Sequence, residues 1–316
     1  MKYHTILLAI IFFGHALSAQ EQAKVSVAQF RGGKDCAVSF TFDDGNKDNC
    51  TIAAPELEKR GWRGTFWLNC SRIPGEIKQQ RHRVTWDDVR AMHATGHEMS
   101  SHGWDHKRLP DLSVKEAMEE IEKNDSAIIA NIGVKPVTYC FAYNAMNDEV
   151  LALASKGRVG VRTRQYAFGE QSSDIQLRER MDKSIVEGDW AVWMTHGLTR
   201  GYDHFSDVSR FASFLDYVKQ YEDKIWVATF RDVAAYIAER DAIRLTLKHR
   251  KNKVIVCPSL PLDAGLFDVP LTMCVENCAD CVSVQQDGKH LEGYRTGTKM
   301  YFEFNPYGGK ISIIYN

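Results

Sequence analysis

The sequence lacks an excess of charge of either sign. It contains 40 Lys and Arg residues against 41 Asp and Glu residues, a net charge of −1, and no block of like charge forms a tail. This balance argues against a non-specific nucleic-acid binder and against a polybasic membrane binder. Charged residues make up 26% and hydrophobic residues 44% of the 316 residues. That composition argues against intrinsic disorder and allows one large domain, or a large and a small one.

Long hydrophobic runs are also absent beyond the first residues, so we expect no integral membrane segment in the mature chain. One short apolar run at 6–13 follows Lys2 and precedes small residues at 16–19. This pattern predicts a signal peptide over residues 1–19. An N-terminal anchor helix is the alternative, but polar residues from Gln20 onward end the run. We therefore expect a secreted or periplasmic protein.

Cysteines are too few, at eight in this chain length, for a small disulfide scaffold. Cys274, Cys278 and Cys281 lie close together in the sequence, with Cys257 upstream. A structural zinc site is one interpretation, but the spacing misses the paired C-x2-C pattern. We favour buried or oxidised thiols, and the sequence does not define their pairing.

Short apolar segments alternate with helical ones between residues 37 and 240. Strands are predicted at 37–42, 64–68, 97–101, 137–143, 159–162, 191–195 and 225–229, and helices at 52–59, 85–95, 113–132, 148–156, 207–221 and 231–240. The alternation predicts an α/β fold in which helices enclose a barrel-like parallel sheet. Functional groups are then expected at the carboxyl ends of the strands.

The pattern changes after residue 242. Helical periodicity is lost, and β-rich pieces recur at 253–257, 271–275, 281–285, 299–304 and 310–314, separated by turn signals. We predict a small antiparallel β-sandwich-like domain over residues 242–316, preceded by a larger domain over residues 20–241. The small domain either supports the barrel or binds carbohydrate, and we favour support.

Two carboxylates and two histidines occupy predicted strand ends. Asp43 and Asp44 precede Gly45 at the end of the first strand, where a glycine lets both side chains turn into one cleft. Taken alone, this would be an ordinary solvated turn. His102 and His106 follow the third strand, and two imidazoles with one carboxylate suit zinc or a similar divalent ion.

A further histidine, His196, follows the strand at 191–195. A histidine at this position could protonate a leaving group opposite a base. The alternative is a structural histidine that bonds to the backbone.

These motifs, in this order, resemble the NodB-type polysaccharide deacetylases of carbohydrate esterase family 4. The resemblance covers roughly residues 25–240 and rests on Thr-Phe-Asp-Asp-Gly at 41–45, the His-x3-His pair and the late histidine. It implies a distorted (β/α) barrel and hydrolysis of N- or O-acetyl groups on a glycan. It also implies one divalent metal ion, usually zinc and sometimes cobalt, nickel or manganese. By position, Asp43 matches the catalytic base, Asp44, His102 and His106 match the metal ligands, and His196 matches the general acid.

The sequence departs from the family at two motifs. Gly103 stands where members usually have Ser or Thr. The third motif, commonly Arg-x-Pro-Tyr, reads Cys-Phe-Ala-Tyr-Asn-Ala-Met at 140–146, so that Ala142 aligns with the arginine that orients the base. We expect an arginine from a neighbouring strand, Arg162 or Arg164, to take its place.

Three further residues are predicted to bind substrate. The backbone N–H near Ala145 is expected to contact the oxyanion, since the family uses a backbone donor there. Trp104 and Tyr143 lie beside the motifs and could stack on sugar faces, although aromatic residues near strand ends are as often part of the core.

Two functions fit these features. The first is a metal-dependent glycan deacetylase, a hydrolase of amide or ester bonds. The second is a glycan-binding protein that has lost efficient catalysis, which the altered third motif favours. We expect the enzyme, because a decaying enzyme should lose its base or its acid first, and both are present. The identity of the glycan and the oligomeric state are not defined by the sequence.

Overall fold

The structure is a computed structural model that describes residues 24–73, 82–278 and 281–315. The signal peptide predicted at residues 1–19 lies outside these residues. Within the described ranges, no helix combines the length and the apolar character needed to cross a membrane.

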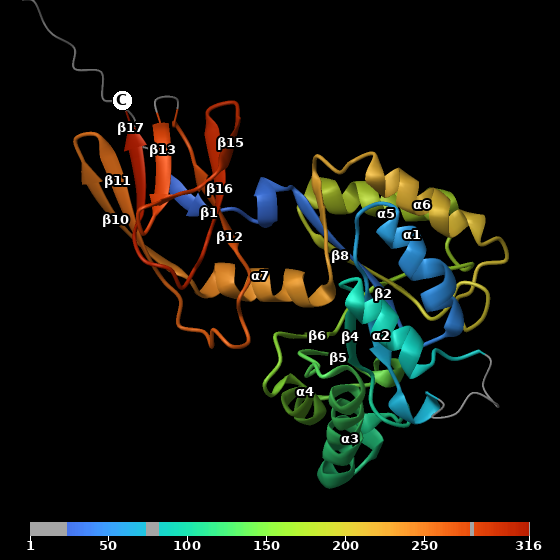
Figure 1. Cartoon of the computed structure of the whole chain (residues 1–316). Helices are drawn as coiled ribbons and strands as arrows, with labels where there is room; N and C mark the ends of the chain where they lie inside the picture. Colours follow the sequence, from blue (N-terminus) through green and yellow to red (C-terminus); the bar gives the residue numbers. More distant parts are fainter. Residues whose placement is uncertain (1–23, 74–81, 279–280, 316) are drawn as a thin grey trace, which may run out of the picture.

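The larger part of the molecule is built on a curled parallel sheet that is flanked by helices (Figure 1). Its strand order is β6-β5-β4-β3-β2-β8-β7, and β9 also pairs with β2. The strands are β2 (Cys36–Phe42), β3 (Thr65–Leu68), β4 (Glu98–Ser101), β5 (Thr138–Cys140), β6 (Gly160–Arg162), β7 (Tyr166–Ala167), β8 (Trp190–Thr195) and β9 (Ile225–Val227). The longest, β2, is buried at every position, as expected for the centre of a parallel sheet. The predicted α/β barrel is confirmed.

Helices follow most of these strands. They are α1 (Ala54–Glu58), α2 (Trp86–Ala94), α3 (Val114–Ile132), α4 (Asp148–Ser155), α5 (Asp174–Glu187), α6 (Ser209–Lys219) and α7 (Phe230–Ala242). The capping box that begins α3, Ser113 with Glu116, is formed, and Gly133 ends the helix in the left-handed conformation.

The helix α5 is absent from the sequence-based prediction. It buries only Leu177, Met181 and Ser184, so its apolar stripe is narrow and its remaining positions are mostly polar. A stripe this narrow gives a weak periodic signal.

Two antiparallel sheets form a separate β-unit, as predicted (Figure 1). One has the order β1-β12-β16-β15 and the other β10-β11-β17-β13-β14. The strands are β1 (Val25–Val27), β10 (Arg244–Arg250), β11 (Lys253–Ser259), β12 (Leu271–Val275), β13 (Cys281–Gln286), β14 (Lys289–His290), β15 (Gly293–Thr296), β16 (Lys299–Phe304) and β17 (Ile311–Tyr315). The predicted boundary between residues 241 and 242 assigns β1 to the larger domain. In the structure, β1 pairs with β12 and so belongs to the β-unit, although it precedes the barrel in the sequence.

The helix α7 joins the two parts of the molecule (Figure 1). Phe230 and Tyr236 belong to the same hydrophobic cluster as Val256, Met273 and other core residues of the β-unit. The Tyr236 hydroxyl donates to the carbonyl of Ala28, 2.9 Å away, beside β1. The barrel and the β-unit therefore share a core, which supports the expectation that the β-unit buttresses the barrel.

All eight cysteines are free thiols in the structure. Cys274, Cys278 and Cys281 are buried, and Cys257 is half-buried. This arrangement agrees with the interpretation of these residues as buried thiols.

Candidate active site

A pocket of about 490 Å³ opens at the carboxyl ends of the barrel strands. Asp43 follows β2, His102 follows β4, Phe141 follows β5 and His196 follows β8. Parallel strands bring these ends to one edge of the sheet, so residues distant in sequence meet there. This central pocket is lined by Asp43, Asp44, His102, His106, Phe141, Tyr143, Asn144, Met194, His196, Tyr202 and Asp203.

Three predicted metal ligands lie together in the central pocket. Asp44 Oδ1 is 3.2 Å from His106 Nε2 and 3.6 Å from His102 Nε2. His102 donates from Nδ1 to the carbonyl of Cys140 at 2.8 Å, which leaves the Nε2 lone pair directed toward the carboxylate. Among the described residues, Asp44 Oδ1 is buried without a hydrogen-bond partner. The donor set therefore fits a divalent ion.

Both histidines are neutral, as metal ligands must be. Burial lowers the pKa of His102. Burial, together with the neighbouring His102, lowers the pKa of His106 to about 4.

The glycine that departs from the family pattern fits its surroundings. Gly103 has a φ of +78°, and a Cβ at this position would lie 3.1 Å from the Tyr139 hydroxyl. The conformation and the nearby hydroxyl together disfavour the Ser or Thr that family members usually carry.

The predicted base is held by an arginine. The buried Asp43 carboxylate accepts two hydrogen bonds from Arg162, at 2.9 Å and 2.5 Å. Burial opposes ionisation of Asp43, but the charge and hydrogen bonds of Arg162 outweigh it and lower the pKa of the carboxyl to about 2. Arg164, the alternative, instead donates to Asp189 at 2.7 Å, away from the pocket. The assignment of Arg164 as a base-orienting residue is therefore wrong.

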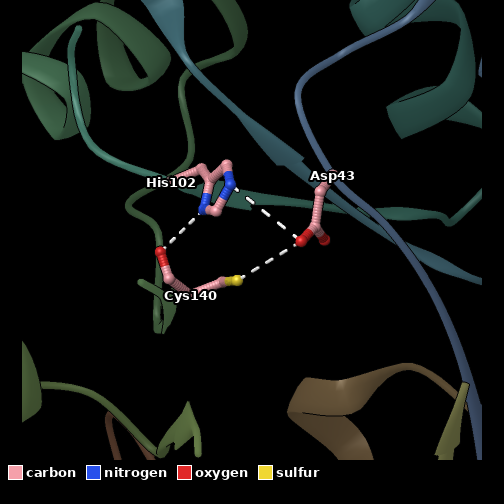
Figure 2. Close-up of side chains that lie close together, drawn as sticks. All are labelled: Asp43, His102 and Cys140. Atoms are coloured by element: carbon pink, nitrogen blue, oxygen red, sulfur yellow. Dashed lines mark hydrogen bonds and ion pairs between the residues drawn. The ribbon is translucent and has the colours of Figure 1, made fainter. Parts of the chain in front are cut away.

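A buried thiol, which the sequence analysis missed, adjoins the base (Figure 2). Cys140 Sγ is 3.7 Å from Asp43 Oδ2, and Asp43, His102 and Cys140 form a second group that could hold a metal ion. Arg162 Nη2 lies 2.7 Å from the same sulfur, so a positive charge already occupies this position. Burial also raises the pKa of the Cys140 thiol well above its usual range. We therefore favour the Asp44 set as the metal site.

The predicted acid, His196, has a carboxylate behind it. His196 Nδ1 is 3.6 Å from Oδ2 of the buried Asp203. Burial lowers the pKa of His196, whereas Asp203, Asp43 and Asp44 raise it. The carboxylates have the larger effect, so the pKa of His196 lies above its usual value. His196 thus retains a proton more readily than a free histidine.

Nearby polar residues fix the loop that carries this histidine. The amide of Asn46 donates to the His196 carbonyl at 2.7 Å. The Asp48 carboxylate accepts the backbone N–H groups of Leu198 and Thr199, at 2.8 Å and 2.6 Å. The sequence offers one signal for these two residues, since both follow the Asp-Asp-Gly turn within five residues of Asp43.

One of the three predicted substrate contacts lies in the central pocket. Tyr143 is 62% exposed, and its ring centroid is 4.6 Å from that of His106. Trp104 does not line the pocket, because its half-buried ring packs under the Lys123 ammonium at 4.3 Å. Ala145 is buried, and its N–H donates to the carbonyl of Ala142 at 3.1 Å, which closes a turn. The structure therefore does not place Trp104 or the Ala145 N–H in the central pocket, and their assignment to substrate binding stays a prediction.

A family comparison agrees with this geometry. Residues 31–161 match the model of the polysaccharide deacetylase family. The matched region contains Asp43, Asp44, His102 and His106. Residues 31–161 thus match a polysaccharide deacetylase domain, in agreement with the resemblance to the NodB-type deacetylases of carbohydrate esterase family 4.

Individual relatives are distant. The chain is 23% identical over 209 residues to the peptidoglycan-N-acetylglucosamine deacetylase PgdA of Listeria monocytogenes, an alignment that covers 59% of this chain and 41% of that protein. It is also 23% identical over 341 aligned residues to gellan lyase of a Bacillus species, across 93% of this chain but 13% of that protein. The chain thus spans well under two thirds of either relative.

A solved structure shares the fold. A Mycobacterium smegmatis protein described as a polysaccharide deacetylase aligns with a TM-score of 0.53 at 18% identity, over 72% of this chain and 98% of that one.

Proposed function

We propose that the protein is a metal-dependent hydrolase that removes acetyl groups from a polysaccharide or oligosaccharide. One observation carries the proposal. A neutral two-histidine, one-carboxylate donor set, an ionised Asp43 and a readily protonated His196 line the same pocket. The match to the polysaccharide deacetylase family supports a carbohydrate substrate.

Asp44, His102 and His106 would hold one divalent ion, for which zinc is the first candidate. Such an ion, when bound, lowers the pKa of water and polarises the acetyl carbonyl. Cobalt, nickel and manganese remain alternatives, because imidazole and carboxylate donors accept each of them.

The protein's own residues divide the proton transfers. Asp43, kept ionised and oriented by Arg162, accepts a proton from the attacking water. His196, kept charged by Asp203, then donates a proton to the departing amine or sugar hydroxyl. Tyr143 and Tyr202, which are 62% and 76% exposed, offer aromatic faces to sugar rings at the pocket.

A glycan-binding protein with weakened catalysis is the second candidate. The third-motif turn supports it, because Ala142 and Ala145 replace the family's arginine and tyrosine. The contact between Arg162 and Asp43 supports the enzyme instead, because it supplies the missing charge from β6.

Export is a further part of the proposal. Acetylated glycans such as peptidoglycan lie outside the cytoplasm, and a signal peptide at residues 1–19 would deliver the protein there.

Metal content and acetate release together test the proposed function. The purified protein should contain about one divalent ion per chain, measured by elemental analysis, and His102→Ala should remove most of it. It should also release acetate from at least one of peptidoglycan, chitin oligomers, poly-N-acetylglucosamine and acetylated plant polysaccharides. Unchanged metal content in His102→Ala would refute the ligand assignment. Glycan binding without acetate release would favour the second candidate.

A further inference from the structure

Arg162 reaches Asp43 across the interior of the barrel. Arg162 is the last residue of β6 and Asp43 follows β2, and the strand order places β5, β4 and β3 between them. In a flat sheet, four strand spacings would separate the two residues by roughly 19 Å, which is farther than an arginine side chain extends. The curl of the sheet brings them together. The guanidinium therefore lies in the buried interior, where a charged group needs partners.

Hydrogen bonds hold the guanidinium within its own plane. Nη1 donates to Asp43 Oδ1 at 2.9 Å and to the Thr41 hydroxyl at 3.0 Å. Nη2 donates to Asp43 Oδ2 at 2.5 Å and to the Cys140 sulfur at 2.7 Å. The N–H groups of a guanidinium lie in its plane, so these contacts leave its two faces unsupported.

The ring of Trp67 covers one of these faces. Trp67 lies in β3 and is fully buried, and its ring centroid is 4.4 Å from Arg162 Cζ. The indole N–H donates to the Thr138 hydroxyl at 3.3 Å, and the ring meets the edge of Phe230 at 5.3 Å between centroids. The indole is thus held from two sides. Among aromatic rings indole attracts a cation most strongly, and the attraction grows when water is excluded.

We propose that Trp67 is a positioning residue for the deacetylation reaction. Its ring fixes the plane of the Arg162 guanidinium, and the guanidinium fixes the Asp43 carboxylate that accepts the proton of the attacking water. The inference rests on the proposed function, because Asp43 is a base only in that reaction. Trp67 does not line the central pocket, so it acts on the chemical step and not on substrate binding.

The test compares Trp67→Leu with Trp67→Phe, because phenylalanine keeps an aromatic face and leucine does not. Trp193→Leu is the matched control. Trp193 is 1% exposed on β8, and its ring packs against the rings of Tyr166, Phe168 and Phe214. The probe is p-nitrophenyl acetate, an acetyl ester that needs no sugar contact. The measured quantity is the turnover that the metal-loaded protein loses when a chelator is added.

We expect Trp67→Leu to lower kcat about tenfold with KM nearly unchanged, as the loss of one desolvated cation–π contact allows. Trp67→Phe should restore most of the turnover, and Trp193→Leu should keep the wild-type kcat. Added to Arg162→Ala, Trp67→Leu should lower kcat no further, since residues that act as a unit are non-additive. Equal losses of kcat in Trp67→Leu and Trp193→Leu, or the same loss with and without Arg162, would overturn the inference.

A second measurement leaves the shape of the side chain almost unchanged, in case Trp67→Leu does not fold. Tryptophan analogues with one and then two fluorine atoms on the indole are incorporated at position 67, and separately at Trp193. Fluorine withdraws electron density from the ring face, which weakens its attraction for a cation. We expect kcat to fall stepwise with fluorination at position 67 and to stay constant with fluorination at Trp193. A constant kcat in both series would overturn the inference.

A spectroscopic readout separates this inference from the proposed function. Guanidinium protons over an indole face are shifted upfield in the proton NMR spectrum, and selective isotope labelling of arginine, with Arg162→Lys for assignment, identifies them. Trp67→Leu should abolish the shift. If the wild-type protein showed this shift but no metal-dependent turnover, the proposed function would fail and the contact between Trp67 and Arg162 would stand. Turnover that no change at Trp67 lowers would reject the inference and leave the deacetylase.

Discussion

The barrel and the β-unit bury different kinds of side chain. The barrel buries charged or ionisable residues around its central pocket, among them Asp43 and His102 after β2 and β4, Arg162 at the end of β6, and Asp203 on the loop after β8. Among the described residues of β10 to β17, the buried polar residues are Thr272 and Gln286, and the rest of the core is apolar. Burying charge is costly unless it is paired. The charges around the central pocket therefore need partners such as Arg162 for Asp43, whereas the core of the β-unit is almost entirely apolar.

The largest effect is expected at the base Asp43, whose buried charge has a chemical role that no residue of the β-unit core has. Asp43→Asn keeps the shape of the side chain but cannot accept a proton, so turnover should fall on the order of 10²-fold or more while the metal stays bound. Acetate release and metal analysis on the same sample measure both quantities.

The adjacent Asp44→Asn variant is the matched control. It should instead weaken metal binding, because an amide oxygen is a poorer ligand than a carboxylate. If both variants lost metal equally, the division of labour between Asp43 and Asp44 would be wrong.

The positioning arginine should have the next largest effect. We expect Arg162→Ala to lower turnover by about tenfold or more, and to cost little further when it is added to Asp43→Asn, since residues that act as a unit are non-additive. Kinetics of the two single variants and the double variant measure this. An equal loss in both backgrounds would show that Arg162 does not act through Asp43.

The carboxylate behind the acid should have a smaller effect that depends on pH. His196 must be protonated to donate, so activity falls as pH rises through its pKa. Asp203→Asn removes a cause of the raised pKa, so the alkaline limb of the kcat profile should move to lower pH. On the alkaline limb, kcat of Asp203→Asn should be about tenfold lower than that of the wild type, and at acidic pH the two should differ little. An unchanged limb would exclude Asp203 as the residue that holds the proton on His196.

The smallest effect is expected where the barrel meets the β-unit. Glu239 on α7 is buried, and burial raises its pKa from 4.5 to about 7. A raised pKa stabilises the folded state below about pH 4.5, and this contribution is lost as pH rises through about 7.

Glu239→Gln should therefore gain about 1–2 kcal/mol in the free energy of unfolding at pH 8 relative to pH 5, with activity unchanged. Denaturant unfolding at the two pH values measures the gain. Glu292→Gln, an exposed change in the β-unit, is the control. A pH-independent difference would show that Glu239 does not titrate in this range.

Local patterns in the sequence predict the barrel, the β-unit and the residues at strand ends. Asp43 and His196 directly follow the apolar strands β2 and β8, and His102 directly follows β4, so strand position and residue type suffice to place them. Arg162 and Arg164 are two positions apart, and the sequence does not distinguish them. In the structure, Arg162 is the last residue of β6 and is buried, whereas Arg164 lies beyond the strand and is exposed.

Other parts of the site depend on loops that carry no periodic signal. Asp203 approaches His196 from a loop between β8 and α6, and sequence spacing does not fix such an approach. The N–H of Ala145 donates within a short turn, a contact that the residue pattern does not indicate. These contacts depend on tertiary structure, so pattern reasoning could not supply them.

The first described strand has a consequence for the order of folding during synthesis. Val25 of β1 pairs with Val275 of β12, 250 positions later in the chain. The ribosome therefore synthesises the whole barrel sequence before β12 is made, and β1 has no strand partner during that time. Pairings of such long range are slow to form. The barrel can assemble first, with closure of the sheet that contains β1 as the last step, after β12 and β16 have emerged.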